Sequence, residues 1–106
     1  MKSKMMVGLL ILFAFAAFAV AGNSAAGKDV FSSNCVMCHG ADASASTPMG
    51  KMLKIPDLHS PTVQKLSDAD LTNVISKGHN RIPAFGSKLT AEQITQVVAF
   101  IRTLKK

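Results

Sequence analysis

A chain of 106 residues is long enough for a single domain. The 48% hydrophobic and 17% charged residues exclude a disordered chain, seven Gly and four Pro exclude a collagen-like or low-complexity one, and two Cys are too few for a disulfide-rich scaffold. The net charge is +6, but the chain has no Trp and no Tyr on which single-stranded nucleic acid could stack, so nucleic acid is not an expected partner.

The first residues have the pattern of an export signal. Two lysines within the first four residues are followed by an uncharged, strongly apolar run over 5–21. The run ends in Ala-Val-Ala at 19–21, the arrangement of small residues that signal peptidase cleaves. The pattern predicts that residues 1–21 are a cleaved signal peptide and that residues 22–106 form the mature, soluble domain. An uncleaved membrane anchor is the alternative, because the apolar run is only just long enough to cross a bilayer.

The first half of the mature chain combines a helix with a long irregular stretch. Residues 27–38 are predicted to be helical, with Val30 and Phe31 on the apolar face. Residues 40–61 should be irregular, because they hold two Gly, three Pro and a run of small residues. A loop of this length is usually functional or wrapped around something. Residues 60–66 are expected to form a short helical turn.

The second half carries the clearer helix signals. Ser67 and Asp70 have the spacing of a capping box, in which each side chain bonds the other residue's backbone N–H, and the helix that they start should end before Gly78. Thr90 and Gln93 mark the start of the last helix in the same way. Its apolar stripe consists of Ile94, Val97, Val98, Ile101 and Leu104. No segment alternates like a strand and no repeat is visible, so the predicted fold class is all-α.

Cys35-Val36-Met37-Cys38-His39 is a C-x-x-C-H motif, the attachment pattern of c-type haem. In a helix the two thiols lie about one turn apart, so each can reach one vinyl group on the same edge of a porphyrin and form a thioether. His39 is then carried to the face of the ring, where its imidazole can ligate iron. The motif predicts one covalently bound haem c, held by Cys35 and Cys38, with His39 as the proximal iron ligand.

Three other interpretations of the two cysteines are weaker. A zinc site needs two more ligands, and His59 and His79 are too far apart in the sequence for the usual spacing of a zinc finger. A thioredoxin-like redox pair belongs to a βαβ unit, and this chain offers no strands. A plain disulfide suits an exported chain but gives the adjoining His39 no role.

Two segments together resemble a small class I c-type cytochrome, of the photosynthetic or short bacterial kind, over essentially the whole mature chain. Residues 31–40 resemble the first helix and haem motif of that family, and residues 82–90, Ile-Pro-Ala-Phe-Gly-Ser-Lys-Leu-Thr, resemble its distal loop. The resemblance implies three to four helices wrapped around one haem. It also implies that the first and last helices cross, with Gly27 and Phe100 as the small and aromatic residues of the crossing.

One position departs from this family. Its distal loop typically reads Met-Pro-x-Phe, with the Met as the sixth iron ligand, whereas this chain has Ile82, Pro83 and Phe85 at the corresponding positions. The resemblance implies that these three side chains form the distal haem wall, but isoleucine has no lone pair to give to iron. The sixth position is therefore either open or taken by a residue of a nearby loop. The candidates are His79, Met49, Met52 and His59.

The motif, the export signal and the resemblance together predict a periplasmic monohaem cytochrome that carries single electrons and is not an enzyme. The alternative is a haem protein whose open or exchangeable sixth position senses or processes CO, NO or peroxide. His79 and Arg81 make weak peroxidase-like chemistry a minor form of this alternative, because a distal His with an Arg can support it.

The charge of the mature chain predicts the kind of partner. Removal of residues 1–21 takes away two lysines and no acidic residue, which leaves a net charge of +4. A basic surface favours acidic partners through electrostatic steering, so we expect a monomer that meets redox proteins with acidic docking surfaces. Five basic residues lie in or beside the segments expected to border the haem: Lys51, Lys54, Lys77, Arg81 and Lys88.

Overall fold

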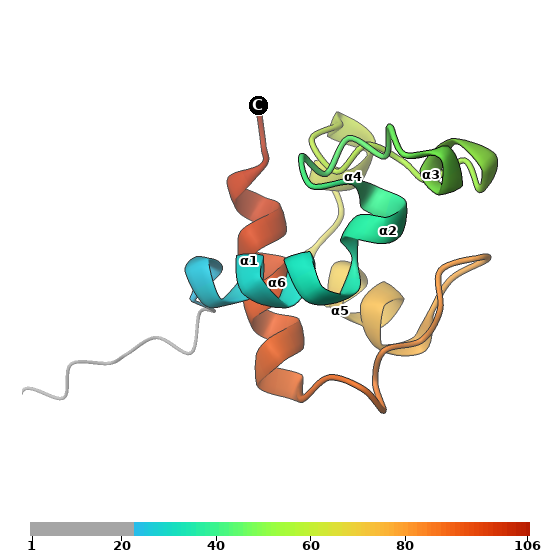
Figure 1. Ribbon diagram of the computed structural model, residues 1–106. Helices are drawn as coiled ribbons and strands as arrows, with labels where there is room; N and C mark the ends of the chain where they lie inside the picture. The colour runs from blue at the N-terminus through green and yellow to red at the C-terminus, as the bar shows by residue number, and fades with distance from the viewer. Residues whose placement is uncertain (1–22) are drawn as a thin grey trace, which may run out of the picture.

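The computed structural model describes residues 23–106, and the predicted signal peptide at 1–21 lies outside them. The described chain is helical and contains no β-sheet, which confirms the all-α class (Figure 1). None of the helices in this part of the chain is long and apolar enough to span a membrane. The helices are α1 (Ser24–Asn34), α2 (Val36–His39), α3 (Pro48–Met52), α4 (Pro61–Gln64), α5 (Asp68–Lys77) and α6 (Ala91–Thr103).

The prediction of one continuous helix over 27–38 is wrong at both ends and in the middle. The helix begins earlier because the Asn23 side chain accepts hydrogen bonds from two exposed backbone N–H groups of its first turn. It stops at Asn34, and Cys35, with φ −119°, separates α1 from α2. The N–H of Cys35 still bonds the carbonyl of Phe31 at 2.8 Å, so the chain bends without losing that hydrogen bond.

A short helix lies within the stretch that the sequence predicts to be irregular. Pro48 occupies the first turn of α3, where its missing N–H costs no hydrogen bond, and the Thr47 hydroxyl caps the helix by accepting from the N–H of Gly50 at 2.9 Å. The expected helical turn within 60–66 is α4. Thr47 followed by Pro48 is a pattern typical of a helix start, but the surrounding small residues suggest an irregular segment.

The two later helices begin where their capping boxes predict. The Ser67 hydroxyl accepts from the N–H of Asp70 and the Asp70 carboxylate accepts from the N–H of Ser67 at the start of α5. Thr90 and Gln93 make the same reciprocal pair at the start of α6, at 3.1 and 2.9 Å. Each box satisfies N–H groups that the first turn of a helix leaves without a partner.

The crossing of α1 over α6 organises the core (Figure 1). A Cβ atom on Gly27 would lie 1.9 Å from the backbone oxygen of Gln96, so only glycine lets the two helices approach this closely. Beside this contact the rings of Phe31 and Phe100 pack with centroids 5.1 Å apart and planes inclined by 50°. The predicted crossing at Gly27 and Phe100 is therefore present. The buried core comprises Phe31, Ala43, Leu58, Val63, Leu71, Val97, Val98, Phe100 and Ile101.

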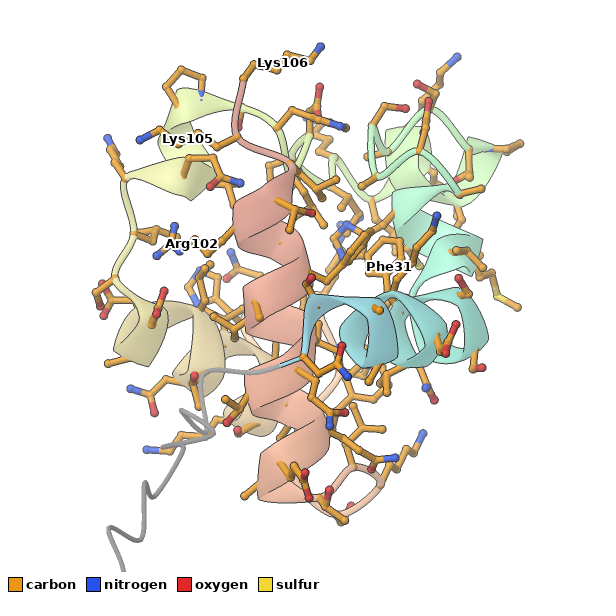
Figure 2. All side chains as sticks on the ribbon, turned by 90° about the vertical axis from the view of Figure 1, so that its left-hand side faces the viewer. Phe31, Arg102, Lys105 and Lys106 are labelled. Atoms are coloured by element: carbon orange, nitrogen blue, oxygen red, sulfur yellow. The ribbon has the colours of Figure 1, made fainter. Side chains whose placement is uncertain are left out.

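Arg102, near the end of α6, ties that helix to the segment between α4 and α5 (Figure 2). Its Nε donates to Asp68 Oδ1 at 2.7 Å, and Nη1 donates to the carbonyl of Gln64 at 2.9 Å. Nη2 donates to the carbonyl of Leu66. A further hydrogen bond joins the same two segments: the Gln64 Nε2 donates to the carbonyl of Ile101 on α6 at 2.9 Å. The Arg102 guanidinium satisfies the carbonyls of Gln64 and Leu66 near the end of α4.

We predict that Gly27→Ala destabilises the protein. The added methyl group must push α1 away from α6, and overpacking of this kind costs about 1–3 kcal/mol, which exceeds the smaller gain in helix propensity. The free energy of unfolding in guanidinium chloride measures the loss. Ser33→Ala, an exposed change in the same helix, is the control and should be nearly neutral. A Gly27→Ala protein as stable as this control would contradict the close crossing.

Candidate haem site

The interruption of the helix at Cys35 places the C-x-x-C-H motif on a separate turn. Cys35 precedes α2, and Cys38 and His39 are its last residues. The N–H of His39 donates to the carbonyl of Cys35 at 2.9 Å, so the motif forms one closed helical turn. Both cysteines are free and half-buried. Gly40 then ends the turn with φ +81°, in the region that favours glycine.

The environment of Cys35 suppresses its ionisation. Burial, and to a smaller extent the charge of a neighbouring Cys38 thiolate, raise the pKa of the Cys35 thiol to about 11. Redox-active C-x-x-C pairs work through a cysteine whose pKa is lowered. The site therefore lacks the electrostatics of a thioredoxin-like pair, and keeps Cys35 as a neutral thiol.

The environment of His39 favours the neutral form of its imidazole. Burial lowers its pKa below the usual value, because an imidazolium would lose its hydration there. Its Nδ1 atom is buried and has no hydrogen-bond partner within residues 23–106. The Phe31 ring packs beside the imidazole, with centroids 5.9 Å apart and planes inclined by 43°. A neutral imidazole is the form that binds a metal ion.

The loop after the motif wraps around the end of α2. The N–H of Ala45 donates to the carbonyl of His39 at 2.7 Å, and the Thr47 hydroxyl donates to the carbonyl of Cys38 at 2.8 Å. Gly50 packs so closely that a Cβ atom there would lie 2.4 Å from the Cys38 oxygen. Ala43 and Ala45 both adopt positive φ angles near 60° to make these turns. The last carbonyls of α2 are thus satisfied by this loop rather than by water.

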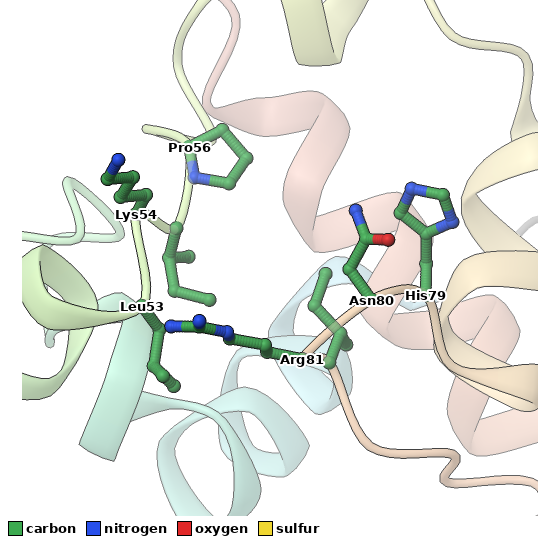
Figure 3. A pocket seen from close by; sticks show the side chains of 8 residues that line it. Leu53, Lys54, Pro56, His79, Asn80 and Arg81 are labelled. Atoms are coloured by element: carbon green, nitrogen blue, oxygen red, sulfur yellow. The ribbon is translucent and has the colours of Figure 1, made fainter.

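A cavity of about 800 Å³ lies between two loops on one side of the molecule, and we call it the crevice. Figure 3 shows Leu53, Lys54 and Pro56 on one wall facing the loop of Arg81 on the other, with the Arg81 side chain extending across toward Leu53. The residues that line it are Leu53, Lys54, Ile55, Pro56, His79, Asn80, Arg81 and Ile82. Nothing in the sequence predicts Leu53, Ile55 and Pro56 at the site. Neither their spacing nor a motif links them to the loop that carries Ile82.

One wall of the crevice is a tight hairpin. His79 and Ile82 exchange both backbone hydrogen bonds, at 3.1 and 2.9 Å, as an isolated antiparallel pair. Gly78 and Asn80 have positive φ angles, and a Cβ atom on Gly78 would lie 2.6 Å from the Ile82 oxygen. The N–H of Phe85 then bonds the carbonyl of Ile75 at 2.9 Å. The hairpin is thereby anchored to the end of α5.

The structure brings some of the predicted site residues together and separates others. Ile82 and His79 line the crevice, whereas Pro83 and Phe85 follow it along the loop and do not. Phe85 is half-buried, with the Lys88 ammonium 5.7 Å above its ring centroid. The C-x-x-C-H residues are not among those that line the crevice either. They lie at the start of α2 and on it, and α2 packs against α3.

The three other candidates for the sixth ligand lie outside the crevice lining. Met52 on α3 is 63% exposed, and Met49 on the same helix is half-buried. His59 is held by Asp57, whose Oδ1 lies 2.7 Å from its ring Nδ1 and 2.9 Å from its backbone nitrogen. These hydrogen bonds lower the pKa of the Asp57 carboxyl.

Comparison with known proteins shows that this chain has related sequences. Residues 22–101 match the family model described as cytochrome c oxidase, cbb3-type, subunit III. The chain is 39% identical over 99 residues to cytochrome c6 of Rippkaea orientalis, a match that covers 87% of this chain and 86% of that protein. It is 36% identical over 85 residues to the cbb3-type oxidase subunit FixP of Rhizobium etli, of which it covers only 28%.

Solved structures agree with the sequence matches. The c-type cytochrome KustC0563 superposes with a TM-score of 0.70 at 29% identity, over 76% of this chain and 98% of that one. Cytochrome cL of Methylophaga aminisulfidivorans shares the fold, with a TM-score of 0.63 at 22% identity over 77% of this chain and 53% of that one. The chain therefore belongs to the c-type cytochromes. Within them it is a small class I cytochrome with one covalently bound haem c.

The residues of this chain fit that cofactor. The two free thiols lie one helical turn apart, and Cys35 remains a neutral thiol. His39 is neutral beside them, and its buried Nδ1 has no competing partner within 23–106. The crevice, which these three residues do not themselves line, is apolar and basic, as the haem ring and its carboxylates require.

We predict that Cys35→Ala or Cys38→Ala greatly lowers the yield of folded protein. A domain this small buries little apolar surface and depends on its cofactor as a staple. Mass spectrometry of the purified protein measures covalent haem, and circular dichroism measures folding. Met37→Ala, at a residue that is 77% exposed between the two cysteines, is the matched control and should retain both. A stable, folded, haem-free Cys35→Ala protein would refute this dependence.

Proposed function

We propose that this chain is a single-electron carrier in which Cys35 and Cys38 form the two thioether bonds to haem c and His39 is the proximal iron ligand. The observation that supports it best is the closed turn of α2, where two free thiols adjoin a neutral, half-buried imidazole. The bound haem supplies an iron that changes its oxidation state by one electron. The protein holds that group in one orientation and shields part of it from water.

The remaining residues have supporting roles in this proposal. Phe31 limits the rotation of the His39 ring, because its own ring packs between that imidazole and Phe100. Ile82 forms the distal wall, and Pro83 and Phe85, which follow it outside the crevice lining, support that wall on a loop that the Phe85 N–H fixes to α5. A rigid wall favours electron transfer, because little of the surroundings must move when the charge on iron changes.

The proposal includes export. The basic start, the apolar run and the Ala-Val-Ala at 19–21 direct the chain across a membrane as a cleaved signal over 1–21, which leaves residues 22–106 as a periplasmic domain. Haem c is attached outside the cytoplasm, so export and the C-x-x-C-H motif support each other.

The proposed partners are redox proteins with acidic docking surfaces, met by a monomer of this chain. Lys54 and Arg81 line the crevice on opposite walls, and both are exposed. Lys51, Lys77 and Lys88 are also exposed, on or beside the same elements. A positive field of this kind steers an acidic partner, and small, weak interfaces suffice for redox encounters.

A potentiometric titration of the holoprotein tests the carrier function. The haem absorption should follow a one-electron curve that is the same in the oxidative and reductive directions, as expected of a carrier that keeps its fold in both states. Hydrogen peroxide should not be consumed beyond the rate given by free haem peptide. Sustained peroxide turnover, or a titration that is not reversible, would favour an enzyme over a carrier.

Electrostatic steering predicts a second result. Oxidation of the reduced protein by the anion ferricyanide should slow as ionic strength rises, and the Lys54→Glu/Arg81→Glu protein should react more slowly than the parent at low salt only. Stopped-flow absorbance measures both rates. The comparable double variant Lys28→Glu/Lys105→Glu, with exposed lysines away from the crevice lining, controls for net charge. Equal slowing by the two variants would contradict a local field at the crevice.

A further inference from the structure

The crevice contains a single side chain of a kind that ligates haem iron. Histidine, methionine, cysteine and tyrosine serve as axial ligands, and His79 is the only one of these among the residues that line the crevice. The two cations in the lining, Lys54 and Arg81, offer hydrogen-bond donors but no lone pair when charged. Ile82 and the other apolar members have no donor atom.

The hairpin places His79 beside the position at which the resemblance puts the distal ligand. His79 and Ile82 are directly opposite each other in an antiparallel pair, and both line the crevice. Opposed residues of such a pair have Cβ atoms roughly 4.5–5.5 Å apart and point to the same face. A histidine at position 79 therefore projects from the same face of the hairpin as a methionine at position 82 would, from a neighbouring position.

The His79 imidazole is also free to bind a metal. It is exposed and makes no hydrogen bond to any residue within 23–106. Its backbone, in contrast, is fixed by the two bonds to Ile82 and by the close packing of Gly78. Such a side chain can turn toward the crevice without any rearrangement of the loop.

We propose that His79 is the sixth ligand of the haem iron, so that His39 and His79 bind it from opposite faces. This inference rests on the proposed haem-binding role of the C-x-x-C-H motif. The consequence is a six-coordinate, low-spin site that excludes CO. Its reduction potential lies below that of a His/Met site, because a methionine ligand raises the potential of haem.

The test is the absorption spectrum of the ferric and ferrous holoprotein, with and without CO, for the parent and for His79→Ala. The parent should be low-spin and unchanged by CO. The His79→Ala protein should become high-spin and bind CO, and added imidazole should restore the low-spin spectrum. His79→Met should remain low-spin but titrate at a higher potential than the parent. A high-spin, CO-binding parent, or a His79→Ala protein that stays low-spin, would overturn the proposal.

If the His79→Ala protein stays low-spin, matched variants identify the residue that binds the iron instead. His59→Ala, Met49→Leu and Met52→Leu should each leave the parent spectrum unchanged, and a change to high spin in any of them would assign the ligand to that residue instead. Ile82→Met in the His79→Ala background should restore a low-spin, CO-resistant site by His/Met ligation. A double variant that remains high-spin would show that this hairpin does not face the iron, and would also overturn the proposal.

These outcomes are separable from failure of the proposed function. If Cys35 and Cys38 hold haem as proposed, every variant retains covalent haem by mass spectrometry and only its spin state, CO binding and potential change. Absence of covalent haem in the parent would contradict the haem-binding role itself. A parent with covalent haem and an open sixth position would overturn the ligation by His79 alone, and would favour binding of a small molecule.

Discussion

The close contact between α1 and α6 at Gly27 is the constraint on which the rest of this structure depends. It lets Phe31 reach both Phe100 on α6 and His39 on α2, so one aromatic ring joins the helix crossing to the C-x-x-C-H turn. The core is small, and a cofactor covalently attached beside this ring adds the apolar contact area that the chain lacks. The packing of the core and the position of His39 thus both depend on the rings of Phe31 and Phe100.

The helices with strong end signals were predictable from the sequence. Capping boxes fixed the starts of α5 and α6, because their reciprocal hydrogen bonds involve residues only three positions apart. The break at Cys35 was not predictable, since no Pro or Gly marks it. The short α3 was hidden among small residues, although Thr47 and Pro48 have the pattern of a helix start.

The site was predictable to the extent that it is local. The motif from Cys35 to His39 indicates its cofactor by spacing alone. The crevice is formed by two loops more than twenty residues apart, and no periodicity shows that such loops meet. For the same reason, the sequence left four candidates for the sixth ligand, and an open sixth position, as alternatives. The lining of the crevice and the pairing of His79 with Ile82 distinguish them.

The interruption at Cys35 has a consequence for how this protein can evolve. In an unbroken helix, any change in the angle at which α1 crosses α6 would swing every later residue with it, including His39. Because α1 ends first, α2 takes its direction from hydrogen bonds to the following loop, through Ala45 and Thr47. Substitutions that shift the helix interface slightly can therefore move the Phe31 ring while the backbone of the C-x-x-C-H turn keeps the direction that the following loop gives it.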